Sequence, residues 1–192
     1  MRKRSKLLLF LGIFLIFCSV LCLLLFQLHG RTAQKRAEEI CHKIEEVLPQ
    51  KSRGMKDIYT EMEMPVLSVE KQDFCGIITF PDYDRKLPIA NLWNAKKTAD
   101  YPCRFYGTVY DGSLILGGSD QEGQFDCLKW LENGSLVTVT NMLGEEFLYK
   151  IYDIEHAESA KTEILLEETA ELTLFVRDTY SMNYIIVRCI GE

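Results

Sequence analysis

The chain has 192 residues, of which 47% are hydrophobic and 11% aromatic, with 12 Gly and 5 Pro. This composition excludes intrinsic disorder, collagen-like repeats and low-complexity linkers, and the length allows one domain plus an attachment segment. The net charge of -6 argues against nucleic-acid binding, which needs a basic surface. Residues 1–6 carry four bases and no acid, whereas the remaining residues carry 18 bases and 28 acids. A basic tip on an acidic body favours orientation in a membrane.

The first apolar run predicts a transmembrane anchor. Residues 7–28 include no charged residue, and a helix of this length spans a hydrocarbon core of roughly 30 Å. The basic tip of residues 1–6 should stay in the cytoplasm, which predicts a single-pass protein of the cell membrane with an extracellular C-terminal domain. The alternative is a cleaved signal peptide. Such a peptide has a shorter apolar region that ends in a small-x-small site, and the sequence Gln27-Leu28-His29-Gly30-Arg31 does not provide one.

Residues 29–72 predict a helical stalk and a connector. Small and apolar residues recur every three or four positions before Pro49, which predicts a helix over residues 31–48. Such a helix is either a spacer that lifts the domain off the bilayer or an element that packs on the domain. Residues 50–72 are mixed and polar, as a connector would be. The recurring residues are Ala33, Ala37, Ile40, Ile44 and Val47.

Residues 73–192 predict a mostly β domain made of short strands. Asp111-Gly112 is a strong hairpin signal between two strand-like runs, and residues 125–131 predict one short helix. Many short strands with one short helix predict a compact antiparallel barrel. The predicted strands are residues 76–80, 87–89, 105–110, 113–116, 136–140, 147–154, 171–177 and 184–190.

Four segments of this domain carry a resemblance to a known family. They are residues 74–81 with 87–89, residues 101–107, residues 114–119 with 123–128, and residues 172–175 with 186–189. In order and spacing they resemble the sortases, the membrane-anchored cysteine transpeptidases of Gram-positive cell walls, and in particular small clostridial-type members of class B or D. The resemblance implies an eight-stranded sortase-like β-barrel with short helices.

The resemblance also implies three catalytic side chains, and all three are replaced. In sortases a cysteine thiolate attacks a Thr–Gly carbonyl of a sorting signal, a histidine transfers protons and an arginine stabilises the oxyanion. The histidine position holds Ser119, the cysteine position holds Arg177 and the arginine position holds Tyr184. A hydroxyl cannot shuttle protons near neutral pH, and a guanidinium is neither a nucleophile nor a base. No catalytic residue of the family is therefore intact.

Other residues could in principle replace the lost nucleophile. A relocated Cys–His pair would need His156, the only histidine of the domain, to reach Cys127 or Cys189. Ser119 lies next to Asp120, but no histidine or lysine nearby in sequence could activate it. A disulfide is possible in an extracytoplasmic domain, although the pairing stays open. The cysteines outside the predicted anchor are Cys41, Cys75, Cys103, Cys127 and Cys189.

Two groups of acidic residues raise the question of a metal. Some sortases bind calcium through loop carboxylates, but neither group has the spacing of a dedicated calcium loop. Solvated acidic loops are the favoured interpretation, and we expect no metal and no cofactor. The two groups are Asp82 with Asp84, and Asp120 with Glu122 and Asp126.

These observations favour a pseudo-sortase, a catalytically inactive protein that keeps a peptide groove. Arg177 would make the groove floor a site for a carboxylate or a peptide carbonyl, together with Tyr184, Ser119 and Asp120. Alternatively, Arg177 pairs with Asp178 or Asp120. The expected partners are a sorting-signal peptide, a pilin or other surface protein, or an active sortase. Two further functions stay open: an active transpeptidase or hydrolase with rearranged residues, and a structural membrane-tethered scaffold.

Overall fold

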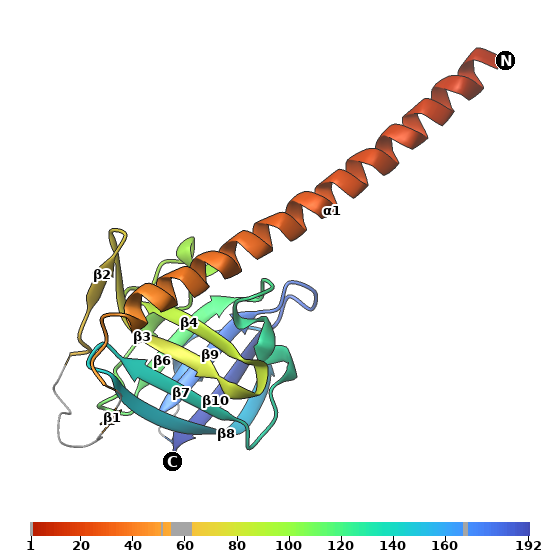
Figure 1. The fold of residues 1–192 in the computed structure, drawn as a ribbon. Helices are drawn as coiled ribbons and strands as arrows, with labels where there is room; N and C mark the ends of the chain where they lie inside the picture. Colours follow the sequence, from red (N-terminus) through yellow and green to blue (C-terminus); the bar gives the residue numbers. More distant parts are fainter. Residues whose placement is uncertain (1, 51, 55–62, 167–168) are drawn as a thin grey trace.

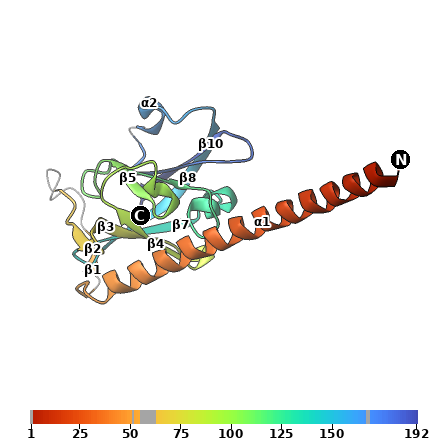
Figure 2. The same ribbon diagram turned by 90° about the horizontal axis from the view of Figure 1, so that it is seen from above.

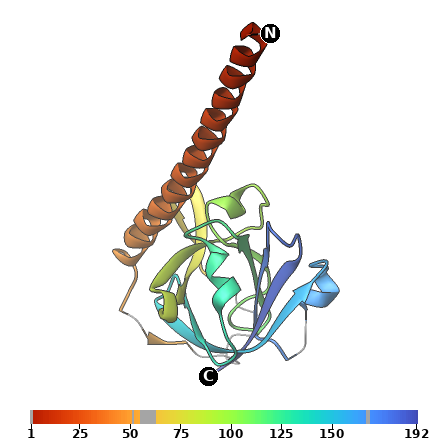
Figure 3. The same cartoon turned by 90° about the vertical axis from the view of Figure 1, so that its right-hand side faces the viewer.

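The computed structural model describes residues 2–50, 52–54, 63–166 and 169–192; in the first helix it describes the side chains of residues 11–22 and from residue 32 onward. A long helix, α1 (Arg2–Glu45), runs from the N-terminus onto a β-barrel (Figure 1). Its N-terminal part extends away from the barrel, and the C-terminus lies at the far end of the molecule (Figure 3).

Eight strands close the barrel in the order β3-β4-β5-β6-β9-β10-β8-β7 and back to β3. This closure confirms the predicted mostly β fold with eight strands in a barrel. The barrel is not wholly antiparallel, because β4 with β5 and β6 with β9 are parallel pairs joined by long crossovers. The strands are β3 (Gln72–Phe80), β4 (Arg85–Ala90), β5 (Cys103–Tyr106), β6 (Leu114–Ser119), β7 (Leu136–Asn141), β8 (Glu145–Ala157), β9 (Leu172–Arg177) and β10 (Tyr184–Gly191).

Several short elements complete the fold. Strand β1 (Ser52–Arg53) pairs with β8, and β2 (Leu67–Val69) pairs with β3. The predicted short helix is present as the 3-10 helix η3 (Phe125–Trp130), and η1 (Pro81–Tyr83) and η2 (Lys97–Ala99) are single 3-10 turns. Helix α2 (Thr162–Leu165), between β8 and β9, was not predicted because four residues give no periodic signal.

Alternation along the strands separates an inner from an outer face. Leu172, Leu174 and Val176 of β9 belong to the main core inside the barrel. Phe175 of the same strand belongs to a second apolar cluster on the outer face, which helix α2 covers (Figure 2). The members of this outer cluster are Ile115, Ala157, Leu165, Phe175 and Ile186.

The predicted stalk helix packs on the barrel instead of standing free. Ala37, Ile40 and Ile44 of α1 are almost fully buried and belong to the main core, and α1 contacts β4 and β2. The helix ends at Glu45, three residues before the predicted end, because the chain turns there towards Pro49. One buried face of the helix therefore fixes its direction relative to the barrel.

Within the described side chains, no helix is both long enough and apolar enough to cross a membrane. The predicted cytoplasmic tip of residues 1–6, and residues 7–10 and 23–28 of the predicted anchor, lie outside those described side chains.

Candidate functional site

The three positions predicted from the resemblance meet at one end of the barrel. Ser119 is the last residue of β6 and pairs in register with Arg177, the last residue of β9. Tyr184, the first residue of β10, pairs with Arg177 from the other side. Paired residues project to the same face of a sheet, so the three side chains form a row on the outer face, here called the polar row. Strand register alone brings them together.

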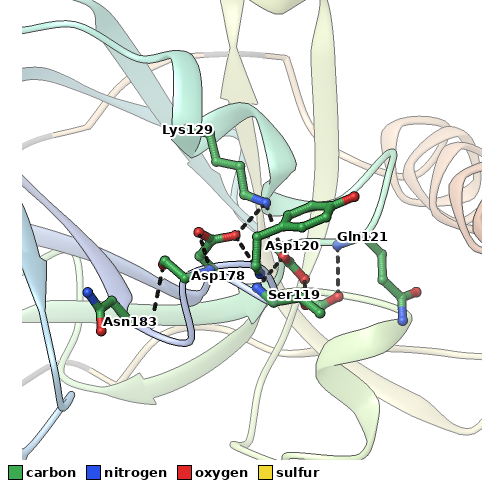
Figure 4. A network of polar contacts seen from close by, with 9 residues as sticks. Ser119, Asp120, Gln121, Lys129, Asp178 and Asn183 are labelled. Carbon is green, nitrogen blue, oxygen red and sulfur yellow. Dashed lines mark hydrogen bonds and ion pairs between the residues drawn. The ribbon is translucent and has the colours of Figure 1, made fainter.

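A lysine that the sequence did not point to forms two ion pairs at this end of the barrel. Lys129 of η3 places its ammonium nitrogen 3.1 Å from Asp120 Oδ2 and 2.9 Å from Asp178 Oδ1 (Figure 4). The Lys129 nitrogen also lies 5.3 Å from the centre of the Tyr180 ring. We call Lys129, Asp120 and Asp178 the Lys129 clamp. The clamp joins η3 to the loop after β6 and to the turn between β9 and β10.

Hydrogen bonds and ion pairing set the ionisation of the clamp. Burial alone would raise the pKa of Asp120, but hydrogen bonds from Thr179 and the Lys129 ammonium bring it below its usual value. Hydrogen bonds from Ser181 and Lys129 lower the pKa of Asp178 as well. Burial works against the charge of Lys129, but its two aspartates raise its pKa overall. All three groups are therefore charged across the neutral pH range.

Among the residues that the structure describes, the Lys129 clamp takes both aspartates next to Arg177. Arg177 is exposed, and its side chain forms no ion pair or hydrogen bond with the residues that the structure describes. The alternative pairing of Arg177 with Asp120 or Asp178 is not present, since both carboxylates bind Lys129. Asp120 was expected to line the groove as a binding residue, and it lies beside the polar row as part of the clamp.

The polar row offers hydrogen-bond donors and a fixed positive charge. Ser119 Oγ accepts a hydrogen bond of 3.1 Å from the backbone N–H of Gln121, which leaves its own O–H able to donate. Tyr184 is half-buried against the outer apolar cluster. A guanidinium flanked by two hydroxyls can bind a carboxylate or a peptide carbonyl. None of the three side chains is a nucleophile or base of useful strength at neutral pH.

Aromatic rings cover the outer face next to the polar row. Two residues before Ser119, a Cβ on Gly117 would lie 2.4 Å from ring atoms of both Phe175 and Trp93. The ring of Phe105 meets each of these rings edge-on, with centroid distances of 5.3 Å to Trp93 and 5.5 Å to Phe175. The three rings, which we call the aromatic triad, therefore require a residue without a side chain beneath them.

Helix α2 covers the same face from the other side. Arg188 of β10 is 5% exposed and holds the helix by donating a 3.1 Å hydrogen bond to the carbonyl of Ile164. Its guanidinium also lies 2.7 Å from Asp153 and 2.7 Å from Glu155. Next to α2, a cavity of about 270 Å³ lies between Ile115 and Thr173 on the strands and Leu165, Leu166 and Ala170. Its lining is mixed, with Asp111 and Ser113 beside the apolar side chains.

The cysteines of the barrel are buried, whereas its histidine is exposed. Burial raises the pKa of Cys75, Cys127 and Cys189 to about 12 in each case. Cys189 is fully buried in the main core, whereas His156 is exposed and pairs with Ile185 in the strand ladder. All seven cysteines are free thiols, so the structure has no disulfide.

The acidic loops are engaged in ion pairs or open to solvent. Asp126 pairs with Arg85 at 3.2 Å, and burial raises its pKa despite that pairing. Asp84 follows η1 in a left-handed conformation with φ of 47°. Among the described residues, no group of three or more His, Cys, Asp or Glu side chains is arranged to hold a metal ion.

Comparison with known proteins identifies the fold. No protein-family model matches the chain, and no curated protein sequence matches it significantly. Among solved structures it is similar to sortase A from Corynebacterium diphtheriae, with 17% identity, 85% of this chain and 84% of that chain covered, and a TM-score of 0.54.

Two further solved structures give the same result. Sortase C2 of pilus island 1 from Group B Streptococcus is 17% identical, with coverages of 84% of this chain and 98% of that chain and a TM-score of 0.55. A sortase D5 transpeptidase from Clostridium perfringens is 16% identical, with coverages of 62% and 79% and a TM-score of 0.53. These similarities, together with the closed eight-stranded barrel, show that the chain has a sortase-like fold.

Proposed function

We propose that this protein is a membrane-anchored, extracytoplasmic pseudo-sortase that binds a peptide at the polar row without cleaving it. The observation that carries the proposal is the exposed guanidinium of Arg177, which lies at the end of β9 with both neighbouring carboxylates taken by Lys129. A fixed cation with hydroxyls on both sides favours a carboxylate or a peptide carbonyl as ligand.

The chemistry of the polar row supports binding over catalysis. A covalent route needs a thiolate or an activated hydroxyl close to a base. Ser119 has Arg177 as its strand neighbour, and an arginine does not accept a proton. The buried cysteines have pKa values that keep them protonated at neutral pH. An active enzyme with rearranged residues therefore has no supporting observation among the described residues.

Helix α1 supports the proposed anchor. Its side chains from Leu11 to Leu21 include many large apolar residues that are more than two-fifths exposed, on a part of the helix that extends away from the barrel (Figure 1). Such a surface is unfavourable in water and favourable in a lipid bilayer. If the anchor is correct, the full chain stays in the membrane pellet after alkaline carbonate extraction. Its release into the supernatant would contradict the anchor and leave the peptide-binding proposal intact.

A titration with sorting-signal peptides tests the binding proposal. The full chain in detergent is titrated with a fluorescent sorting-signal peptide, and binding is read by anisotropy. Loss of a charge-assisted hydrogen bond weakens binding by about 1.5–3 kcal/mol, so Arg177→Ala should reduce the affinity about tenfold or more. Arg53→Ala is the matched control, because it removes the same charge from β1, which pairs with β8 beside Glu145 and Glu146.

The outcomes separate the three candidate functions. Peptide binding that depends on Arg177, with no release of a cleaved product, supports the pseudo-sortase. Turnover of a fluorogenic sorting peptide that is lost in Cys127→Ala, Cys189→Ala or Ser119→Ala would establish an active enzyme. Absence of binding to sorting peptides, to surface proteins or pilins and to an active sortase, with polar-row variants silent in cells, would favour the structural scaffold.

A further inference from the structure

A second cavity lies beside the aromatic triad, and Trp93 and Phe105 of the triad line it. Its volume is about 590 Å³, within the range of ligand-binding pockets. Leu92 and Trp93 line it from the segment after β4, and Phe105 and Tyr106 line it from β5. None of the polar-row residues lines this cavity.

Packing against other rings fixes the position of Trp93 in the wall of this cavity. Trp93 packs against Phe105 and Phe175 with centroid distances of 5.3 Å and 5.5 Å, yet it stays 39% exposed. Tyr106 is 52% exposed and Leu92 is 68% exposed. Rings that are fixed on one side and open on the other present a flat apolar surface with little conformational entropy left to lose on binding.

Polar groups without partners lie beside these rings. The indole N–H of Trp93 and the phenol O–H of Tyr106 have no hydrogen-bond partner among the described residues. The side-chain oxygen of Asn91 is buried and also has no partner there. The Trp93 and Tyr106 donors lie on exposed side chains and are free to donate to a ligand, whereas a buried oxygen such as that of Asn91 is normally paired.

The rim of the cavity is acidic. Glu63 is 86% exposed, and the exposed Asp111 also lines the cavity, with one carboxylate oxygen accepting hydrogen bonds from Thr108 and Ser113 of its own turn. The one cation in the lining, Arg104, is only 14% exposed and donates to the backbone carbonyls of Asn91 and Gly107. Its pairing with Glu63 is 3.6 Å long and only partly neutralises that carboxylate. The field at the opening therefore favours a basic group on the ligand.

We propose that this cavity binds a proline-rich peptide segment in the polyproline II conformation, with a Lys or Arg residue at one end. Proline rings pack flat on aromatic side chains, and a polyproline II backbone has no internal hydrogen bonds, so all its carbonyls can accept. Trp93 N–H and Tyr106 O–H are the donors for two of these carbonyls, and Glu63 and Asp111 attract the basic residue. This site is independent of the polar row and of the function proposed for it.

Peptide titration tests this proposal on the full chain in detergent. A labelled proline-rich peptide with one arginine should bind, and the same peptide with its prolines replaced by alanine should bind about tenfold more weakly or not at all. Tyr106→Ala should weaken binding by a similar factor. Tyr106→Phe should give a smaller loss, because the ring stays and only the hydroxyl is removed. Trp93→Ala should also abolish binding, but it can disturb the aromatic triad. The comparison of Tyr106→Ala with Tyr106→Phe is therefore the decisive test.

Two controls keep the result specific to the cavity. Tyr180→Ala removes a 91% exposed tyrosine from the β9–β10 turn and should leave the affinity unchanged, as should Arg177→Ala. Equal affinity for the proline and alanine peptides, or an unchanged affinity in Tyr106→Ala, would overturn the proposal. Binding of a β-linked amino-sugar oligosaccharide in place of the peptide, lost in Tyr106→Ala, would overturn it in favour of a carbohydrate site.

Discussion

Thr179 donates two hydrogen bonds to Asp120 across 59 residues of sequence. Its backbone nitrogen lies 2.8 Å from Asp120 Oδ2, and its hydroxyl oxygen lies 2.8 Å from Asp120 Oδ1. Lys129 binds the same carboxylate, as Figure 4 shows. The turn between β9 and β10 is therefore fastened to the loop after β6, directly beside the polar row.

Removing the Asp120 carboxylate should loosen this end of the barrel. We expect Asp120→Ala to lower the free energy of unfolding by about 2 kcal/mol, because hydrogen bonds to a charged, mostly buried group contribute roughly 1.5–3 kcal/mol. Asp120→Asn should lose less, since its side-chain oxygen still accepts from Thr179. Urea unfolding of the full chain in detergent measures both. Asp82→Ala is the control, an exposed aspartate in η1, and equal effects at the two positions would contradict the fastening role.

The two aspartates of the Lys129 clamp should make the protein sensitive to acid. Their pKa values are lower in the folded state than in the unfolded state, so their contribution is complete above about pH 4, the usual value for Asp. As the pH falls through the folded-state values, the unfolded state binds more protons and stability is lost. The free energy of unfolding should therefore fall as the pH drops below about 4.

A lysine variant isolates this acid effect. Lys129→Met removes the shared cation, so the fall in stability below about pH 4 should be shallower than in the parent. Asp126, whose pKa is raised by burial, contributes with the opposite sign in both proteins and cancels from the comparison. Lys161→Met, at an exposed position, is the charge-matched control. Identical pH profiles for the parent and Lys129→Met would show that the Lys129 clamp does not set the acid response.

The barrel cysteines should resist alkylation while the protein is folded. Burial raises the pKa of Cys75, Cys127 and Cys189 to about 12, so almost no thiolate forms at pH 8. Iodoacetamide followed by mass spectrometry should label these residues rapidly only after denaturation. Cys22, which is exposed and lies in the predicted anchor, gives an internal comparison for the rate of labelling. Fast labelling of Cys127 or Cys189 in the folded chain would contradict this prediction and would support an active enzyme with one of these cysteines as its nucleophile.

The sequence predicted the parts of the fold that depend on local patterns. Alternating apolar residues in β7 to β10 predicted those strands to within about three residues, and the resemblance implied the eight-stranded barrel. The resemblance singled out Ser119, Arg177 and Tyr184, but their meeting in one row is visible only in the strand register of the structure.

Contacts that depend on packing between distant loops could not be predicted. Lys129 lies in a short helix with no pattern that points to Asp120 and Asp178, and only the folded barrel places both within reach. The choice between a free stalk and a packed helix also depended on a barrel surface that matches Ala37 and Ile40. Periodicity showed that α1 has an apolar face, but it did not show what covers that face.

The aromatic triad should make Gly117 intolerant of any side chain. A Cβ at this position would lie 2.4 Å from Phe175 and from Trp93, and overpacking of this kind costs about 1–3 kcal/mol. We expect Gly117→Ala to lower the free energy of unfolding by that amount, measured by urea unfolding of the full chain. Adding Trp93→Leu should recover part of the loss, because a smaller side chain can move away from the new methyl group. If Gly117→Ala is neutral, or if the second substitution adds to the damage, the rings do not lie tightly on this glycine, and the aromatic wall proposed for the neighbouring cavity is less rigid than the structure indicates.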